Sequence, residues 1–164
     1  MTASGQMFFC EPGTFSVCID TFTSGVARGT FYNSFVEGHH DFSDLMGFLQ
    51  AADRVMDAAA FPQAYYRRRG FCVPVLAGDG VEIAERRRRL RRCRPPKEFT
   101  GLRGRCGTFW INVLYRRGGS WQGVATWFPP KGHTLELTFR SVLELTLAMT
   151  EVLQRQMDEQ RSTE

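Results

Sequence analysis

The stretch FWINVLYRRGGSWQGVATWF, residues 109–128, is the clearest structural signal in this chain. Apolar residues occupy every second position on both sides of Gly118-Gly119, and a period of two predicts β-strands whose alternate side chains face one core. A Gly-Gly pair allows the positive φ angles of a tight turn. Residues 109–128 are therefore predicted to form an antiparallel hairpin.

A third strand and a helix are predicted after this hairpin. Residues 135–139 alternate again, and residues 140–156 change to the period of an amphipathic helix. Ser141 and Glu144 have the spacing of a capping box, in which each side chain accepts a backbone N–H at the helix start. The predicted buried stripe comprises Val142, Leu145, Met149, Val152 and Leu153. The apolar residues outside that stripe, which would meet a second layer or the second subunit of a homodimer, are Leu143 and Leu147.

The first half of the chain repeats this order. Residues 14–33 are predicted to form a hairpin with its turn at 23–25, and residues 41–60 have helical period, with Asp53 and Asp57 off the apolar stripe. Five residues recur at identical spacing 94 positions later. Either a β-β-(β)-α unit is duplicated, or two hairpin-plus-helix segments are similar by chance. The five residues are Phe15, Gly25, Gly29, Gly38 and His39, matched by Phe109, Gly119, Gly123, Gly132 and His133.

We expect one α+β domain over residues 1–164. Units 14–60 and 108–157 would pair into antiparallel sheet with their helices packed on it, residues 62–106 would form an insert, and residues 158–164 a tail. No apolar stretch approaches the roughly 20 residues that span a bilayer. The five cysteines form no CxxC pair, which is typical of a reducing compartment. A cytoplasmic protein that meets no membrane is expected.

The insert carries most of the positive charge. Residues 62–106 contain twelve Arg and one Lys against four acidic residues, a net charge of +9, whereas the rest of the chain has a net charge of −5. Residues 65–75 are predicted as one or two strands and residues 81–93 as a short basic helix. Guanidinium groups bind phosphate through a planar set of donors, and tyrosine rings offer stacking faces for bases. The candidate contact residues are Tyr65, Tyr66, Arg67, Arg68, Arg69, Arg86, Arg87, Arg88, Arg89, Arg91, Arg92, Arg94, Arg103 and Arg105.

Three interpretations of this basic insert are compatible with its composition. It binds nucleic acid or a nucleoprotein complex, it binds an acidic protein surface, or it is a solubilising loop that contacts the acidic remainder of the chain. Trp110 and Phe128 are candidate exposed aromatic contacts, because one face of their hairpin points away from a helix-covered core. The alternative is that both faces of the sheet are covered.

Neither a cofactor nor a metal site is expected. The histidines and cysteines lack a metal-ligand spacing, and Cys18 and Cys72 lie in apolar strand patterns that are typical of buried, inert thiols. The chain is therefore predicted to be a binding protein and not an enzyme. A deep cleft that brings His133 to a cysteine would favour an enzyme instead.

Two resemblances extend this interpretation. The order of strands then helix, given twice, resembles the Whirly and Pur-type single-strand-binding folds, which implies repeats that pair through their sheets and present a curved basic surface. The chain is also similar to small uncharacterised proteins of gut Clostridia, which implies a bacterial or mobile-element origin. That second pattern comprises Ser120-Trp121-Gln122-Gly123, Trp127, Phe139-Arg140-Ser141 and Leu143-Glu144-Leu145.

The leading hypothesis for function follows from the insert. It is a non-enzymatic protein that engages nucleic acid or a nucleoprotein complex through the insert arginines. The alternative is a protein-interaction module or inhibitor, of the anti-CRISPR type encoded by mobile elements. Such a module would block a nucleic-acid-processing protein by occupying its acidic or nucleic-acid-binding surface.

Overall fold

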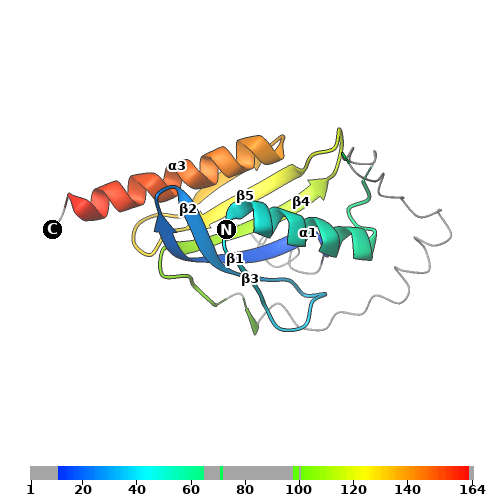
Figure 1. Ribbon diagram of the computed structural model, residues 1–164, viewed down its shortest axis with the longest axis horizontal. Helices are drawn as coiled ribbons and strands as arrows, with labels where there is room; N and C mark the ends of the chain where they lie inside the picture. The colour runs from blue at the N-terminus through cyan, green and yellow to red at the C-terminus, as the bar shows by residue number, and fades with distance from the viewer. Residues whose placement is uncertain (1–10, 65–70, 72–97, 100, 163–164) are drawn as a thin grey trace, which may run out of the picture.

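The computed structural model describes residues 11–64, 71, 98–99 and 101–162, and within them it forms one six-stranded antiparallel sheet and two helices (Figure 1). The predicted α+β class is confirmed. The strands are β1 (Thr14–Thr23), β2 (Val26–Tyr32), β3 (His40–Phe42), β4 (Gly107–Tyr115), β5 (Gln122–Phe128) and β6 (Leu135–Phe139). The helices are α1 (Leu45–Ala59) and α3 (Val142–Arg161).

The strand order of the sheet is β3-β2-β1-β4-β5-β6. Three consecutive strands make each half, a helix follows each set of three, and the two halves join where β1 pairs antiparallel with β4. Both predicted hairpins are present, and the two segments do form one sheet. The common origin of the two halves stays a prediction.

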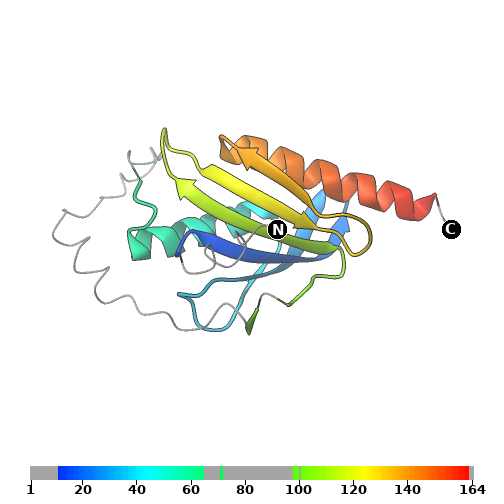
Figure 2. The ribbon, with the colours of Figure 1, turned by 180° about the vertical axis from the view of Figure 1, so that it is seen from behind.

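Both helices lie on the same face of the sheet, which we call the helix face (Figures 1 and 2). The register places Val17 of β1 opposite Phe109 of β4, and both side chains join one buried core with Phe48 of α1 and Leu145 of α3. This is the result of strand alternation, because every second side chain of β1 and β4 points to the helices. The remaining side chains of these strands point to the other face, which we call the opposite face.

Each helix begins at a side-chain cap. Ser141 Oγ accepts the backbone N–H of Glu144 at 3.1 Å, and the Glu144 carboxylate accepts the backbone N–H of Arg140 at 2.7 Å. The predicted capping box therefore forms, with its glutamate reaching one residue further back than expected. Asp44 caps α1 by accepting the backbone N–H of Gly47 at 2.6 Å.

The helix boundaries differ from the prediction at two places. Residues 40–42 form the short edge strand β3, so α1 begins only at Leu45. The sequence predicted residue 40 in a loop and residues 41 and 42 in the helix. Helix α3 continues to Arg161, beyond the expected end at 156. No Pro or Gly interrupts residues 142–162, and Ser162 Oγ donates to the carbonyl oxygen of Asp158 at the new terminus.

Both hairpins turn at the positions that the sequence predicts. Ser24 and Gly25 have φ angles of 52° and 77°, and Gly118 and Gly119 have φ angles of 61° and 70°. Positive φ at both central residues is the type I′ turn, whose twist matches that of paired strands. These turns fix the register of β1 with β2 and of β4 with β5.

A buried ion-pair network ties α1 to the β4–β5 hairpin. The Arg116 guanidinium, 6% exposed as a residue, donates to the carboxylates of Asp53, at 2.9 Å, and Asp57. It also donates to the carbonyl oxygen of Pro62 at 3.3 Å. Trp121 Nε1 donates to Asp53 at 3.1 Å, so Asp53 serves both an arginine and an indole. The network fixes the end of the hairpin against the helix.

The strands predicted in residues 65–75 and the basic helix predicted in residues 81–93 lie outside the described residues, apart from Phe71. Neither α1 nor α3, the helices of the described part of the chain, is long and apolar enough to cross a membrane.

Candidate functional site

Four of the predicted contact residues lie in the described part of the chain: Arg103, Arg105, Trp110 and Phe128. Three of them meet, on the opposite face of the sheet. The predicted contacts that lie outside the described residues are Tyr65, Tyr66, Arg67, Arg68, Arg69, Arg86, Arg87, Arg88, Arg89, Arg91, Arg92 and Arg94.

The strand register places the aromatic pair. Trp110 of β4 lies directly opposite Ser16 of β1 and Thr126 of β5, and Phe128 lies opposite Thr108. Trp110 and Phe128 are therefore diagonal neighbours on the opposite face, within reach of each other. Their ring centroids are 4.5 Å apart at an interplanar angle of 55°. Both residues are half-buried, so the expectation that this face keeps them exposed is met in part.

Arg103 completes this group, which we call the Arg103 cluster (Arg103, Trp110 and Phe128). Its guanidinium carbon lies 4.9 Å from the ring centroid of Phe128 and 5.7 Å from that of Trp110. These distances are within the range of cation–π attraction, worth about 0.5–1 kcal/mol at an exposed site. Arg103 remains exposed. The positive charge is thus held over two rings in a place that solvent, and a ligand, can reach.

The chain before β4 is shaped to bring Arg103 to these rings. The backbone N–H of Gly104 donates to Thr108 Oγ1 at 3.0 Å, and the backbone N–H of Gly107 donates to the Gly104 carbonyl oxygen at 3.0 Å. A Cβ at position 104 would lie 2.4 Å from backbone atoms of Ile19. Only glycine allows this close approach, so the turn is fixed against β1 at Ile19.

A second aromatic pair, which no sequence pattern predicts, lies two strands away. Tyr32 of β2 lies opposite Ser16, in the same cross-strand row as Trp110. The ring of Phe99 stacks on Tyr32 with centroids 6.1 Å apart and an interplanar angle of 12°. Phe99 is buried at 1% exposure. The C-terminal end of the insert therefore packs on the opposite face at two described places, Phe99 and Arg103.

The charges around the cluster are mixed. Arg28 of β2 lies on the opposite face and is exposed, and Arg105 is exposed beside the turn at Gly104. Asp41, which accepts a hydrogen bond from Thr30 Oγ1 at 3.0 Å, also belongs to this face, as does Glu136 of β6. In the described residues the basic character is therefore local to the Arg103 cluster and its neighbours.

Cys18 lies on the same face but is unsuited to nucleophilic chemistry. It is 5% exposed. Burial raises the pKa of its thiol, and the hydrogen bond that Thr108 Oγ1 donates to the sulfur offsets this in part. A cysteine attacks as its thiolate, so a buried thiol with a raised pKa is a structural residue.

The histidines of the described residues contact rings and one carboxylate. The His40 ring stacks on Phe31 with centroids 5.0 Å apart, and His39 Nε2 lies 3.8 Å from an Asp41 carboxylate oxygen. His133 is exposed in the loop between β5 and β6. In the portion of the chain that the structure describes, no three histidine, cysteine or carboxylate side chains converge as a metal ion requires.

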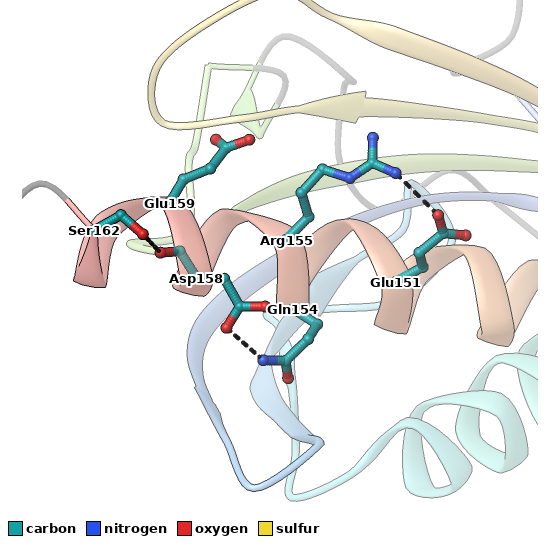
Figure 3. A pocket seen from close by; sticks show the side chains of 6 residues that line it. All are labelled: Glu151, Gln154, Arg155, Asp158, Glu159 and Ser162. Atoms are coloured by element: carbon teal, nitrogen blue, oxygen red, sulfur yellow. Dashed lines mark hydrogen bonds and ion pairs between the residues drawn. The ribbon is translucent and has the colours of Figure 1, made fainter.

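Helix α3 borders two depressions. Between α3 and strands β5 and β6 is a cavity of about 290 Å³, lined by apolar side chains that include Trp127, Leu137 and Ala148. The other is a shallow surface on α3 alone, where Gln154 donates to Asp158 and Arg155 to Glu151 (Figure 3). Because these charged side chains pair with one another along a single helix, this surface gives no convergent chemistry.

No protein-family model, curated protein or solved structure matches this chain. The resemblances to Whirly and Pur-type folds and to proteins of gut Clostridia therefore stay predictions.

Proposed function

We propose that this chain is a non-enzymatic nucleic-acid-binding protein that uses the opposite face of its sheet. The observation that carries the proposal is the exposed guanidinium of Arg103, held 4.9 Å and 5.7 Å from the rings of Phe128 and Trp110. Charge beside aromatic rings is the combination that nucleic-acid surfaces use, because phosphates need cations and bases need flat faces. The arginine-rich residues 86–94 precede this cluster in the chain and would extend the contact along the phosphate backbone.

The arrangement of the two faces supports the same proposal. Both helices lie on the helix face (Figure 2), whereas the opposite face carries the exposed Arg103 and the half-buried rings of Trp110 and Phe128. The two rings of the site lie on strands β4 and β5 in the middle of the sheet, and Arg103 lies in the turn before β4. Contacts built on paired strands hold their geometry better than contacts on loops.

A fluorescence-anisotropy titration with DNA and RNA oligonucleotides at about 50 mM salt tests the proposal. We expect binding that weakens steeply with salt, and a loss of about tenfold in affinity for Arg103→Glu. The matched control is Arg54→Glu, which makes the same change at an exposed position of α1, the helix side of the sheet. Absence of binding to every oligonucleotide, or equal losses for both variants, would overturn the proposal.

A protein interface is the second candidate, and α3 favours it. Leu143 and Leu147 expose 66% and 61% of their surface, although both are large apolar residues on one helix. A second copy of this chain is the simplest partner, since a homodimer would pair the same stripe with itself. Sedimentation equilibrium tests this candidate. We expect a dimer that becomes a monomer in the Leu143→Ser, Leu147→Ser double variant, and a monomeric parent protein would contradict it.

We also propose that the two halves derive from one duplicated unit. Gly29 of β2 and Gly123 of β5, which match in the repeat, meet the same restriction: a Cβ at either would lie 1.9 Å from a carbonyl oxygen of the neighbouring strand. The oxygens belong to Cys18 of β1 and Asn112 of β4. The same backbone approach in both hairpins supports a shared origin more than composition alone does.

A further inference from the structure

The two edges of the sheet differ in how open they are to a further strand. Strand β3 has only three residues, His40–Phe42, whereas β6 has five, Leu135–Phe139, and pairs with β5 residue by residue without a bulge. Proteins keep edge strands from pairing with another chain by short length, proline, lysine or a bulge. Strand β6 contains no proline, lysine or bulge, and among the described residues no strand pairs with its outer side (Figure 2). Its outer edge therefore presents backbone groups to which a further strand can bond.

The side chains of β6 also leave apolar surface at this edge. Leu135, Leu137 and Phe139 alternate onto the helix face, where Phe139 is buried, Leu137 is half-buried and Leu135 is 53% exposed. Both leucines line the cavity of about 290 Å³ between α3 and the sheet. A strand added beside β6 would cover this surface with its own alternating side chains, as in β-strand addition.

We propose that the strand added to this edge is β6 of a second copy of the chain, in an antiparallel two-fold dimer. Full overlap of the two strands places Leu137 on the axis, beside Leu137 of the second copy. Leu135 then lies opposite Phe139 of the second copy, so apolar side chains meet on the helix face. A two-fold contact requires a surface that complements itself, and β6 meets this requirement with its apolar residues.

The charges at this edge complement one another in the same register. On the opposite face, Glu136 lies across from Thr138 of the second copy, so no like charges meet. Arg140 directly follows β6, its side chain is 88% exposed, and it approaches Glu144 at 3.9 Å. Its position in the paired strands is diagonal to Glu136 of the second copy, within reach of a long side chain. The dimer therefore brings opposite charges together twice, once on each side of the axis.

Pairing through β6 would also join the two opposite faces. The two-fold axis of an antiparallel strand pair is perpendicular to the sheet, so both copies turn the same face to the same side. The Arg103 clusters of the two copies would then share one continuous surface, and a nucleic acid that reaches both would bind more tightly than one that reaches a single cluster. This consequence rests on the proposed function. The edge contact stands without it, so its test measures assembly and not binding.

Sedimentation equilibrium of the full chain at low salt tests the contact through substitutions at Thr138, which is exposed. Within one copy Thr138 faces Val124 and Glu136 faces Thr126, so a charge at position 138 meets no charge on the neighbouring strand. We expect the parent protein to be a dimer. Thr138→Glu places a carboxylate opposite Glu136 of the second copy at two symmetry-related places and should weaken dimerisation about tenfold. Thr138→Lys, the matched control, should leave the dimer at least as tight.

A charge exchange across the axis is the second variant. Glu136→Lys combined with Thr138→Glu restores opposite charges and should recover the parent dimer, with far-UV circular dichroism showing that each variant is folded. A monomeric parent protein, or equal dimerisation of Thr138→Glu and Thr138→Lys, would overturn the edge contact. A dimer that Leu143→Ser, Leu147→Ser dissociates and Thr138→Glu leaves intact would overturn it too, because the copies would then meet through α3.

Discussion

Replacing Arg116 by methionine is expected to destabilise the fold by about 3 kcal/mol. The Arg116 side chain is 7% exposed, and its carboxylate partners Asp53 and Asp57 are 16% and 49% exposed. Loss of one partner of a buried ion pair costs about 3–5 kcal/mol, because the other charge stays behind without water. Only Asp53 is buried enough to contribute the full cost of an unpaired charge, because water can reach the Asp57 carboxylate. The estimate therefore lies at the lower end of that range.

The order of the variants follows from the same exposures. Asp57→Asn should cost about 1 kcal/mol or less, as half-exposed ion pairs do. Asp53→Asn should cost more, because it weakens acceptance from both Arg116 and Trp121 Nε1. The double variant Arg116→Met, Asp53→Asn no longer contains the buried carboxylate. Its unfolding free energy should therefore fall by about 1–2 kcal/mol less than the sum of the two single-variant losses.

Urea unfolding followed by far-UV circular dichroism measures these losses without relying on Trp121 fluorescence, which the variants themselves perturb. At about 2–4 °C per kcal/mol for a chain of this size, Arg116→Met should lower Tm by about 6–12 °C. The control is Arg155→Met, since Arg155 pairs with Glu151 at 3.1 Å but is 65% exposed. A loss below about 1 kcal/mol for Arg116→Met, or one equal to that of the control, would refute the reasoning.

Three further predictions test the packing. Cys18 should react with iodoacetamide much more slowly at pH 8 in the folded chain than in urea, because burial raises its pKa and lowers the thiolate fraction; equal rates would contradict this. Ala148→Leu should stabilise the chain by about 1 kcal/mol by filling the cavity beside α3, measured as a rise in Tm, and a fall would show that the cavity cannot take the added carbons. Gly29→Ala and Gly123→Ala should each cost about 2 kcal/mol or more in urea unfolding, because the new Cβ would lie 1.9 Å from a facing carbonyl oxygen. Gly101→Ala, with open space around the glycine, is the neutral control for both.

The hairpins were predictable because their signals are local. A period of two and a pair of positive-φ residues lie within a few positions of each other, and residues 109–128 contain both. The union of the two halves in one sheet was predicted from the need of each half to cover its apolar face, but the strands that join them, β1 and β4, were not. Strand β3 has only three residues, His40–Phe42, too few to show a period, and it was therefore assigned to the loop and helix around it.

The contacts that define the site and the ion-pair network were not predictable, because they join distant segments. Asp53 lies 63 positions from Arg116, and on the sequence it is a polar residue off the buried stripe of its helix. Tyr32 and Phe99 belong to different units of the predicted chain plan, and only the fold stacks them. Arg103 was a candidate for its charge alone. Its position over the rings depends on a turn at Gly104 that no local sequence pattern predicts.

Net charge treats all arginines alike, and the described residues show why that misleads. Arg116 forms ion pairs with two carboxylates of α1 inside the molecule. These carboxylates neutralise its charge, so it cannot attract a ligand. Arg155 is paired along its own helix. Arg103 lies over the rings of Phe128 and Trp110, which attract its charge, and its side chain is exposed. A cation held by aromatic rings is therefore a better sign of a polyanion site than a count of arginines. By this criterion the effect of charge reversal on binding should be large at Arg103, and small at Arg155, whose neighbours already supply the opposite charge.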